Sequence, residues 1–567
     1  MSVFRLSSGL MTLMLGMTLT AGPLHAQKLN PLLIDKDLRE ATKPVTKPSS
    51  VPNLILPKAG QMPENAAATK FEFDDITIEG ARAIPEADLL KFWPFAPGET
   101  SSVADVFAFA EDITALYRNA GYALSFAIIP AQAIDSGRFT IQIIEGRLEG
   151  LSIVGNRVSD LVRSRILDGF SVIDPSQPTK IAELERFLLL VNDLPGITAR
   201  GTISPGETAE TSLLTLDVTQ TRFDGGVSYN NFLSESLGRE ATIIDLKAFN
   251  QWTGRDALHI SLKSAPDIAV YRSSSVNYET YIGSDGLLFE AAASESITRP
   301  KKGDLVALDF SSVAYSQSIG IRMPWKRSRN SNVNIGAALS GSHTVSKNGD
   351  SVTSEDKIRI ASIYAEYDVS HSRGATTNMR LQVNRGMKAL GARGDSRANA
   401  RPNFVTYELS GAHQNPLFTN DSGSLIGALT FRGQSIGSAN PLLANAECSF
   451  GGQQFGVGFD AGALSGENCL LGSARITWQQ NVRDQAAAFV GQAQYYLRYD
   501  SGQLRQEGPL AAGEKRSVKA SSLGLGVQLV MRNGVAFFLE SSKQVTRSDD
   551  TKKRDKSRTH ASVHFGF

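Results

Sequence analysis

The second half of the chain alternates apolar and polar residues in many short stretches. From about Arg222 onward apolar side chains fall on every second position, as in Leu258, Ile260 and Leu262. Successive side chains of a strand point to opposite faces, so each stretch predicts a strand with one apolar and one polar face. Further examples are residues 333–340, 363–369, 523–529 and 535–539, the last two joined by an Asn533-Gly534 turn.

These strands predict a transmembrane β-barrel. About sixteen of them fit into the 345 residues after Arg222 (567 − 222), or roughly 22 residues for each strand with its connection. The polar residues alternate with the apolar ones too regularly for the core of a β-sandwich. An apolar outer face and a polar inner face are instead typical of a membrane barrel. A barrel of this size leaves an aqueous lumen. The terminal alternation of Ala561, Val563, Phe565 and Phe567 predicts the barrel-closing strand.

An internal repeat precedes the barrel. Residues 76–80 (Ile-Thr-Ile-Glu-Gly) are echoed by residues 151–155 (Leu-Ser-Ile-Val-Gly), 75 positions later (153 − 78). Each copy reads strand, helix, helix, strand, strand, which predicts two α+β domains in tandem over residues 71–147 and 148–221. The predicted helices are 85–92, 103–119, 158–167 and 181–192, and the predicted closing strands are 124–130, 138–144, 197–204 and 212–219.

The helices of the repeats carry core residues and offer no site chemistry. In the first repeat, apolar residues lie mostly at helical spacing; in the second, a similar set predicts core. These residues are Phe107, Ala110, Ile113, Ala115 and Leu116, and then Leu184, Phe187, Leu188 and Val191.

The amino-terminal residues predict export from the cytoplasm. A basic Arg5, an apolar stretch from Leu10 to Leu19 and a cut after Ala26 form a signal peptide over residues 1–26. Residues 27–42 are helix-prone, and residues 43–70 form a linker with Pro44, Pro48, Pro52, Pro57 and Pro63. No later stretch approaches the ~18 apolar residues of a spanning helix, so strands must carry any membrane role.

Composition and motifs exclude several functions. The net charge of +1 comes from interspersed charges and gives no basic field for nucleic acid. The Gly-x-Ser-x-Gly match at Gly433–Gly437 would need a strand-to-helix turn to be catalytic, and it lies at the end of a barrel strand instead. No Gly-Lys-Ser/Thr phosphate loop occurs. We therefore expect no enzymatic activity, no catalytic residue, no metal and no other cofactor.

Two cysteines, Cys448 and Cys469, are the only ones in the chain. Because an exported chain meets an oxidising compartment, a disulfide is favoured over free thiols. Metal binding by this pair is not indicated, since no histidine stands at ligand spacing beside it.

The order of these segments resembles the outer-membrane transporters of two-partner secretion, the haemolysin and filamentous-haemagglutinin exporter family within the Omp85-like superfamily. The resemblance covers the whole mature chain. It implies that the repeats are POTRA domains which receive the exported partner in the periplasm, and that the 27–42 helix can plug the lumen. It also implies a long loop that folds back into the lumen, after about eleven strands and before five more.

The loop tip departs from the family at one position. Residues Gly456, Val457, Gly458 and Phe459 stand where the family has Val-Arg-Gly-Tyr/Phe, so Val457 replaces the arginine. Asp500 resembles the barrel-wall acid that pairs with that arginine, and the usual salt bridge is expected to be missing. A disulfide between Cys448 and Cys469 would bracket the same loop and could partly substitute for the arginine anchor.

The resemblance implies the export of a large adhesin or haemolysin as cargo. Further expected partners are outer-membrane lipid and, during biogenesis, the barrel-assembly machinery and periplasmic chaperones, but not nucleic acid. An assembly factor of the same superfamily remains an alternative, although it would more often have more repeats and the loop arginine. A passive porin would lack the repeats, and an adhesin or secreted enzyme would need an extracellular domain for which the chain has no room.

Overall fold

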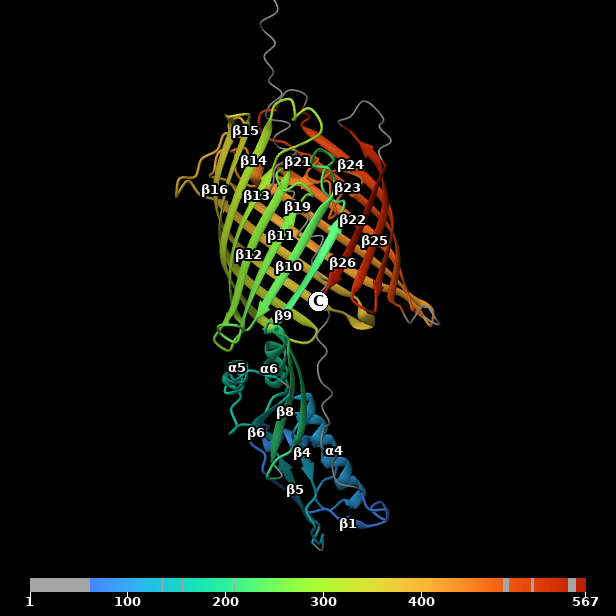
Figure 1. Ribbon diagram of the computed structural model, residues 1–567. Coiled ribbons are helices and arrows are strands. Elements are labelled where there is room, and N and C mark those ends of the chain that lie inside the picture. The colour runs from blue at the N-terminus through green and yellow to red at the C-terminus, as the bar shows by residue number, and fades with distance from the viewer. Residues whose placement is uncertain are drawn as a thin grey trace, which may run out of the picture.

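A computed structural model of the protein describes residues 62–134, 136–155, 157–208, 210–482, 489–510, 514–548 and 557–567. The predicted signal peptide (1–26), the predicted plug helix (27–42) and residues 43–61 of the predicted linker lie outside the described residues. Two small domains form a narrow stalk below one end of a closed barrel (Figure 1). We call that end of the barrel the domain end and the opposite end the far end.

The first small domain packs two helices on a three-stranded sheet. Its strands pair in the order β2-β5-β4, with β2 parallel and β4 antiparallel to β5. Ser102 and Asp105 form a capping box at the start of α4, because each side chain accepts a hydrogen bond from the other residue's backbone N–H. The elements are β1 (Lys70–Glu72), β2 (Asp75–Glu79), α3 (Glu86–Leu89), the 3-10 helix η1 (Leu90–Phe92), β3 (Thr100–Ser102), α4 (Val103–Asn119), β4 (Phe126–Ile128) and β5 (Arg138–Ile144).

The buried face of α4 differs in part from the predicted one. Ala110 and Ile113 are buried as predicted, but Ala115 is exposed and Phe107 only half-buried. The rest of the buried face is formed by Val106, Phe109, Thr114 and Tyr117. The error arises because eleven of the seventeen residues of this helix are apolar or aromatic, so spacing alone does not fix which side faces the sheet.

The second domain repeats the same topology. Its strands pair in the order β6-β8-β7. As in the first domain, the central strand β8 has one parallel neighbour, β6, and one antiparallel neighbour, β7. The predicted core residues Leu184, Phe187, Leu188 and Val191 are all buried. The elements are β6 (Arg147–Val154), α5 (Asp160–Phe170), α6 (Ile181–Asp193), β7 (Ile197–Pro205) and β8 (Thr211–Gln220).

The end of the predicted linker belongs to the first domain. Ala66 is buried and its carbonyl accepts a hydrogen bond from Ala104 N (3.2 Å), at the start of α4. Lys70 begins β1, which pairs with β3. Both strands have only three residues, too few for a visible alternation, and the sequence therefore did not reveal them.

Sixteen antiparallel strands close into the barrel, which confirms the predicted fold class. The last strand, β26, closes the barrel on β9 over the five pairs from Ser562↔Asn230 to Gly566↔Gly226. The strands are β9 (Phe223–Asn230), β10 (Ala241–Phe249), β11 (Asp256–Ser264), β12 (Tyr271–Ile282), β13 (Leu287–Thr298), β14 (Phe310–Arg327), β15 (Ser331–Asn348), β16 (Ser351–Ser370), β17 (Thr376–Gly386), β18 (Val405–Asn420), β19 (Gly423–Ile436), β22 (Asn468–Gln480), β23 (Val490–Arg505), β24 (Ser517–Met531), β25 (Val535–Arg547) and β26 (Ser557–Gly566).

The two faces of the barrel wall are those that the alternation predicts. Ile363 and Leu339 point outward and are 64% and 51% exposed, whereas Ser362 faces inward and is buried. The minor 3-10 turns are η2 (Glu235–Leu237), η3 (Ser372–Gly374) and η4 (Ala444–Ala446). Among the described residues, no helix is both long and apolar enough to span a membrane.

The second domain is docked on the first turns of the barrel at the domain end. Arg327, at the end of β14, donates two hydrogen bonds to the Asp193 carboxylate, at 2.7 and 2.8 Å. Asn250 Nδ2 donates to the carbonyl of Pro195 (2.6 Å). Charge-assisted, two-point contacts of this kind fix an orientation as well as a distance. The small domains are therefore held to one side of the barrel, below β10 to β15.

Candidate functional site: a lumen loop and a cleft beside the barrel

A long loop between β19 and β22 folds back onto the inner wall of the barrel. It spans residues 437–467 and narrows to a short hairpin, β20 (Cys448–Phe450) paired with β21 (Leu464–Gly466). The tip comprises residues 451–463. Its Phe455 and Phe459 form an apolar cluster with Phe450 of β20 and with Leu471 and Leu504 of the wall. Eleven barrel strands precede this loop and five follow it, as the family resemblance predicts.

Glycines let the tip approach the wall closely. Gly456 has a φ of +85°, and a Cβ there would come within 2.5 Å of the Phe450 ring. A Cβ on Gly458 would lie 3.0 Å from backbone and side-chain atoms of Lys543 and Ser522. A side chain at Gly456 would therefore clash with Phe450 inside the loop, and one at Gly458 would press on Lys543 and Ser522 of the wall.

Asp500 holds the tip through backbone amides. Its side chain is fully buried, and its Oδ2 accepts hydrogen bonds from Gly456 N and Val457 N, both at 3.0 Å. Ser522 Oγ donates to the same oxygen at 3.3 Å. The acid thus contacts the loop at the predicted position, although Val457 itself offers no charge.

Arg498 supplies the cation that the loop lacks. Its Nε donates to Asp500 Oδ1 at 2.7 Å. Its Nη1 donates to the carbonyl of Gln453 (2.6 Å), and its Nη2 donates to the carbonyl of Gln454. The expected loss of the loop arginine is accompanied by an arginine on the wall that grips the loop backbone.

Four further side chains of the last strands complete the contact. Ser542 Oγ (3.2 Å) and His560 Nε2 (2.9 Å) both reach the carbonyl of Val457. Gln544 Nε2 donates to the carbonyl of Gly458 (2.9 Å), and Arg558 pairs with Asp460 (2.7 Å). These residues and Arg498 were not predicted from the sequence. The available signal was parity, since residues 498 and 500 lie on the same face of one strand.

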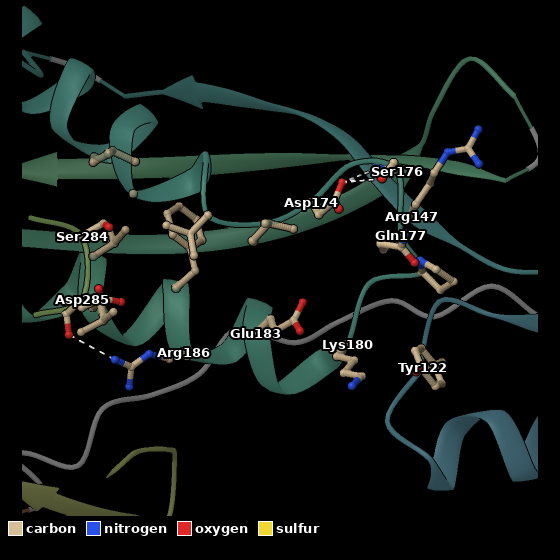
Figure 2. Close-up of a pocket in the computed structure, with 18 of the residues that line it drawn as sticks. Tyr122, Arg147, Asp174, Ser176, Gln177, Lys180, Glu183, Arg186, Ser284 and Asp285 are labelled. Atoms are coloured by element: carbon tan, nitrogen blue, oxygen red, sulfur yellow. Dashed lines mark hydrogen bonds between the residues drawn. The ribbon is translucent and has the colours of Figure 1, made fainter. Parts of the chain in front are cut away.

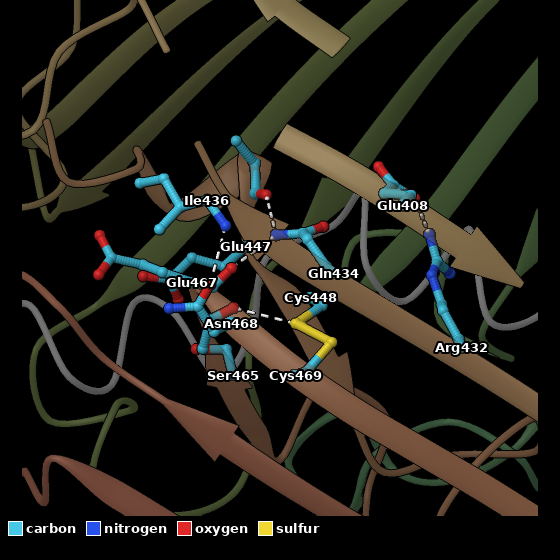
Figure 3. The surroundings of a disulfide bond; sticks show 12 residues. Glu408, Arg432, Gln434, Ile436, Glu447, Cys448, Ser465, Glu467, Asn468 and Cys469 are labelled. Atoms are coloured by element: carbon cyan, nitrogen blue, oxygen red, sulfur yellow. Dashed lines mark hydrogen bonds and ion pairs between the residues drawn. A yellow bond between two sulfur atoms is a disulfide. The ribbon is translucent and has the colours of Figure 1, made fainter. Parts of the chain in front are cut away.

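A disulfide joins the base of the loop to the wall. Cys448 of β20 and Cys469 of β22, 21 positions apart in the sequence, are bonded, and the tip lies between them (Figure 3). Gln434 Nε2 donates to the carbonyls of Ala446 (3.1 Å) and Glu467 (3.0 Å) beside it. Both ends of the tip are therefore fastened at the far end of the barrel.

The far end is covered by loops joined through one buried arginine. Arg397, from the loop between β17 and β18, pairs with Glu447 (3.2 Å) of the lumen loop. It also pairs with Glu514 (3.1 Å) of the loop between β23 and β24. Glu467 accepts hydrogen bonds from Leu442 N (2.7 Å) and Gly508 N (3.0 Å). Three loops thus form one hydrogen-bonded layer over this side of the lumen.

At the domain end, a cleft of about 610 Å³ lies between the two small domains and the barrel turn at residues 283–286. Its floor is apolar and is formed by Ile166, Phe187 and Leu190 of the second domain. Val172, at its margin, is 64% exposed. The rim is charged, with Arg147, Lys180, Glu183 and Arg186 around it (Figure 2).

Hydrogen bonds fix parts of this rim. Arg186 Nη2 donates to the carbonyl of Asp285 (3.1 Å), which ties α6 to the barrel turn. Ser176 donates to Asp174 from its backbone N (2.8 Å) and its Oγ (2.7 Å), and these bonds lower the pKa of the Asp174 carboxyl. Ile181 N donates to the carbonyl of Gly121 (2.9 Å), so the first domain is joined to α6 as well. The cleft is a preformed space with an apolar floor and polar walls.

Comparison with known proteins assigns the chain. The POTRA domain of ShlB type matches residues 71–146, and the family described as haemolysin secretion/activation protein ShlB/FhaC/HecB matches residues 210–529. The chain belongs to the ShlB/FhaC/HecB family. This ShlB/FhaC/HecB protein is accordingly an outer-membrane transporter of two-partner secretion, with its POTRA region in the periplasm.

Individual relatives agree with this assignment. The heme/hemopexin transporter protein HuxB of Haemophilus influenzae (strain 86-028NP) is 24% identical over 471 residues, 80% of each chain. The outer membrane transporter CdiB of Dickeya dadantii (strain 3937) is 24% identical over 65% of each chain. The solved structure of CdiB from Escherichia coli has a TM-score of 0.73 at 17% identity and covers 97% of this chain and 99% of its own. The domain end of the barrel is thus its periplasmic end, and the far end is its outer end.

Proposed function

We propose that this transporter exports a large, β-rich adhesin or haemolysin, which its POTRA region captures unfolded in the periplasm. The observation that carries the proposal is the cleft, because it opens between both POTRA domains and a turn of the barrel. An extended chain lying there would contact the receiving domains and the entrance of the pore together.

Two features of the cleft suit an unfolded polypeptide. The apolar floor can take up side chains of any apolar type, and the charged rim can pair with either sign, so little sequence is demanded. The sheet orders also leave β6 and β7 as edge strands of the second domain, where backbone groups can pair with an added strand. Both modes favour capture of a chain before it folds.

Export through the lumen requires the loop to leave or shift. The tip and the outer loop layer are held by hydrogen bonds and ion pairs, and none of these involves a nucleotide site. We infer that cargo folding outside drives the passage and that the chain catalyses no reaction. For its own biogenesis we propose that periplasmic chaperones deliver the chain to the barrel-assembly machinery.

The test is a substitution in the cleft with a matched control. Val172→Asp places a charge at the margin of the apolar floor, whereas Leu167→Asp places one on the same domain, at a residue that is also exposed but outside the cleft. The full-length transporter with Val172→Asp is expected to bind the amino-terminal region of its exoprotein at least tenfold more weakly, equal to about 1.4 kcal/mol. Leu167→Asp is expected to bind as wild type. Equal binding by both variants would refute capture in the cleft.

A further inference from the structure

The outer surface of the barrel has a groove that none of the export steps uses. It has a volume of about 860 Å³ and runs over β12 to β16. Its central line is one row of paired residues across five strands, Val276↔Ala293, Ala293↔Gln317, Gln317↔Gly341 and Gly341↔Arg359. These residues share the outward face with Ile319 and Leu339, which are exposed at the barrel surface.

Side-chain size explains the groove. Ala293 and Gly341 are small, and larger outward residues on the same or adjoining strands, Tyr278, Tyr315 and Leu339, rise on both sides. The result is a shallow channel on the membrane-facing wall, mostly apolar, with Gln317 as the polar residue in the middle of its central row. In a membrane this channel is covered by lipid, so its natural occupant is an acyl chain.

From Val276 to Arg359 the groove runs towards the outer end of the barrel, and its outer end is basic. Val276 is six residues from the periplasmic end of β12 (282 − 276), and Arg359 is eleven from that of β16 (370 − 359). At ~3.3 Å per residue and a tilt of ~40°, these positions stand about 15 Å and about 28 Å above the periplasmic end. The apolar band of such barrels is ~25 Å tall, so Arg359 lies at headgroup level in the outer leaflet.

Arg359 is held flat against the wall. A Cβ on Gly341 would come within 3.3 Å of its Cδ and Nη1, so the guanidinium lies directly over this glycine. Nη1 donates to the carbonyls of Ile358 (2.8 Å) and Ser342 (3.2 Å). These bonds fix the group while leaving Nε and Nη2 for another acceptor.

A second arginine faces outward beside it. Arg385 of β17 is exposed on the same face as Met379 and Leu381, and Met387 N, two residues on, donates to the carbonyl of Arg359 (2.8 Å). Within the part of the chain that the structure describes, neither arginine has an acidic partner at ion-pair distance. Lipid-facing arginines without partners are costly unless they bind an anion at the interface.

Neighbouring charges keep the region positive. Glu355 is shared by His343 (2.9 Å), Lys357 (3.1 Å) and Arg393 (2.7 Å). Asp395 is the second acid nearby, and its carboxylate accepts a hydrogen bond from Glu355 N (2.7 Å). With Arg359 and Arg385, four permanent cations stand at the upper end of the groove against three acids, the third being the buried Asp356, whose Oδ1 accepts a hydrogen bond from Asp395 N (3.2 Å).

We propose that this groove is a binding site for a lipid of the outer leaflet with phosphate groups on its headgroup. Arg359 and Arg385 bind a phosphate, for which the guanidinium fork is well shaped, and an acyl chain occupies the channel down to Val276. Bound lipid holds β12 to β17 at a fixed height in the membrane, on the side of the barrel where the POTRA region is docked.

The experiment titrates the purified full-length transporter in detergent with diphosphoryl lipid A. Wild type is expected to bind, and Arg359→Ala/Arg385→Ala to bind at least tenfold more weakly. Arg359→Lys/Arg385→Lys, which keeps both charges, is expected to retain most of the affinity. The control is Arg272→Ala, which removes an exposed arginine at the outer end of β12, outside the groove. Heat-modifiable migration shows that each variant is folded.

Two further probes identify the source of the anion. Lipid A without phosphates is expected to bind about as weakly to wild type as diphosphoryl lipid A does to the double alanine variant. Inorganic phosphate alone at millimolar concentration is expected not to displace the lipid. The proposal is overturned if the double alanine variant binds diphosphoryl lipid A like wild type, if phosphate-free lipid binds equally well, or if free phosphate displaces the lipid.

Discussion

At the residue scale, the lumen loop is held by a cation on the wall instead of one at its own tip. Arg498 joins the buried carboxylate of Asp500 to two carbonyls of the loop, while Asp500 takes two amides from the tip. A buried charge that loses its partner is strongly destabilising. The attachment of the loop should therefore depend on Arg498 more than on any residue of the loop.

Arg498→Ala tests this directly. Leaving Asp500 buried without its cation is expected to weaken the attachment of the tip by about 3 kcal/mol. Limited proteolysis of the folded barrel should then cut within residues 451–463, where wild type resists.

The control restores the family's arrangement. Val457 contacts the region of Gly524 and Glu540, which the removal of the Arg498 side chain would enlarge. Arg498→Ala/Val457→Arg should therefore recover protection of the loop from the protease, because the new loop arginine can reach Asp500. Protection unchanged in Arg498→Ala would show that the wall arginine does not anchor the loop.

The cysteine pair gives a second prediction at this scale. Both thiols should be inert to a maleimide probe until reduced, and Cys448→Ser should make Cys469 reactive, since the two are bonded in the structure. Closing a loop of about 20 residues contributes ~3 kcal/mol in the chain-entropy account. Labelling of both cysteines in the unreduced, folded protein would contradict the bond.

How far the site could be predicted differs from residue to residue. Asp500 and the tip were found because the family resemblance points to them, and both lie where the loop meets the wall. Arg498 was missed although it stands two positions from Asp500, on the same face. Its partners in the loop are the backbone carbonyls of Gln453 and Gln454. Because every residue has a backbone carbonyl, the sequence does not show which carbonyls will accept a hydrogen bond from Arg498.

At the element scale, few residue pairs join the last strand of the barrel to the first. β26 meets β9 over five pairs, and Phe567 then exchanges hydrogen bonds with Gly225 in both directions (3.0 and 3.1 Å). The Phe567 side chain is 75% exposed on the outer face, where lipid surrounds it. The terminal residue therefore belongs both to the seam and to the lipid-facing surface.

Phe567→Asp is expected to lower the level of heat-modifiable protein in the outer membrane several-fold, because a charge replaces an aromatic on the lipid-facing side of the seam. Phe567→Tyr, which keeps the ring, is the matched control and should insert like wild type. Immunoblots of membrane fractions with and without heating give the result. Normal insertion of the aspartate variant would contradict the role of this strand.

The elements themselves followed from periodicity where they were long enough. The 75-residue echo correctly predicted two domains with a shared order of strands, and alternation predicted the barrel. Three-residue strands such as β1 and the packing of Ala66 on the first domain were not predicted, because neither has a periodic signal in the sequence.

At the scale of the whole molecule, the proposed site of cargo capture lies next to the entrance of the barrel. The cleft opens beside the periplasmic end of the barrel, and the second POTRA domain is fixed to the barrel by Arg327 and Asp193. Since the receiving domains cannot move freely away from the pore, a captured chain is presented at its entrance. We infer that these domains, rather than the barrel, select the cargo.

Selection by these domains is tested by deleting the first POTRA domain and measuring the amount of cognate exoprotein in the medium. Removing residues 71–145 leaves β6 and the later elements of the second domain in place and takes only Leu124 from its core. The deletion variant should insert at normal levels and remain heat-modifiable, because the barrel closes without this domain. Its cargo is expected to stay in the periplasm or to be degraded there. Release of full-length cargo at the wild-type rate by the normally inserted variant would contradict it.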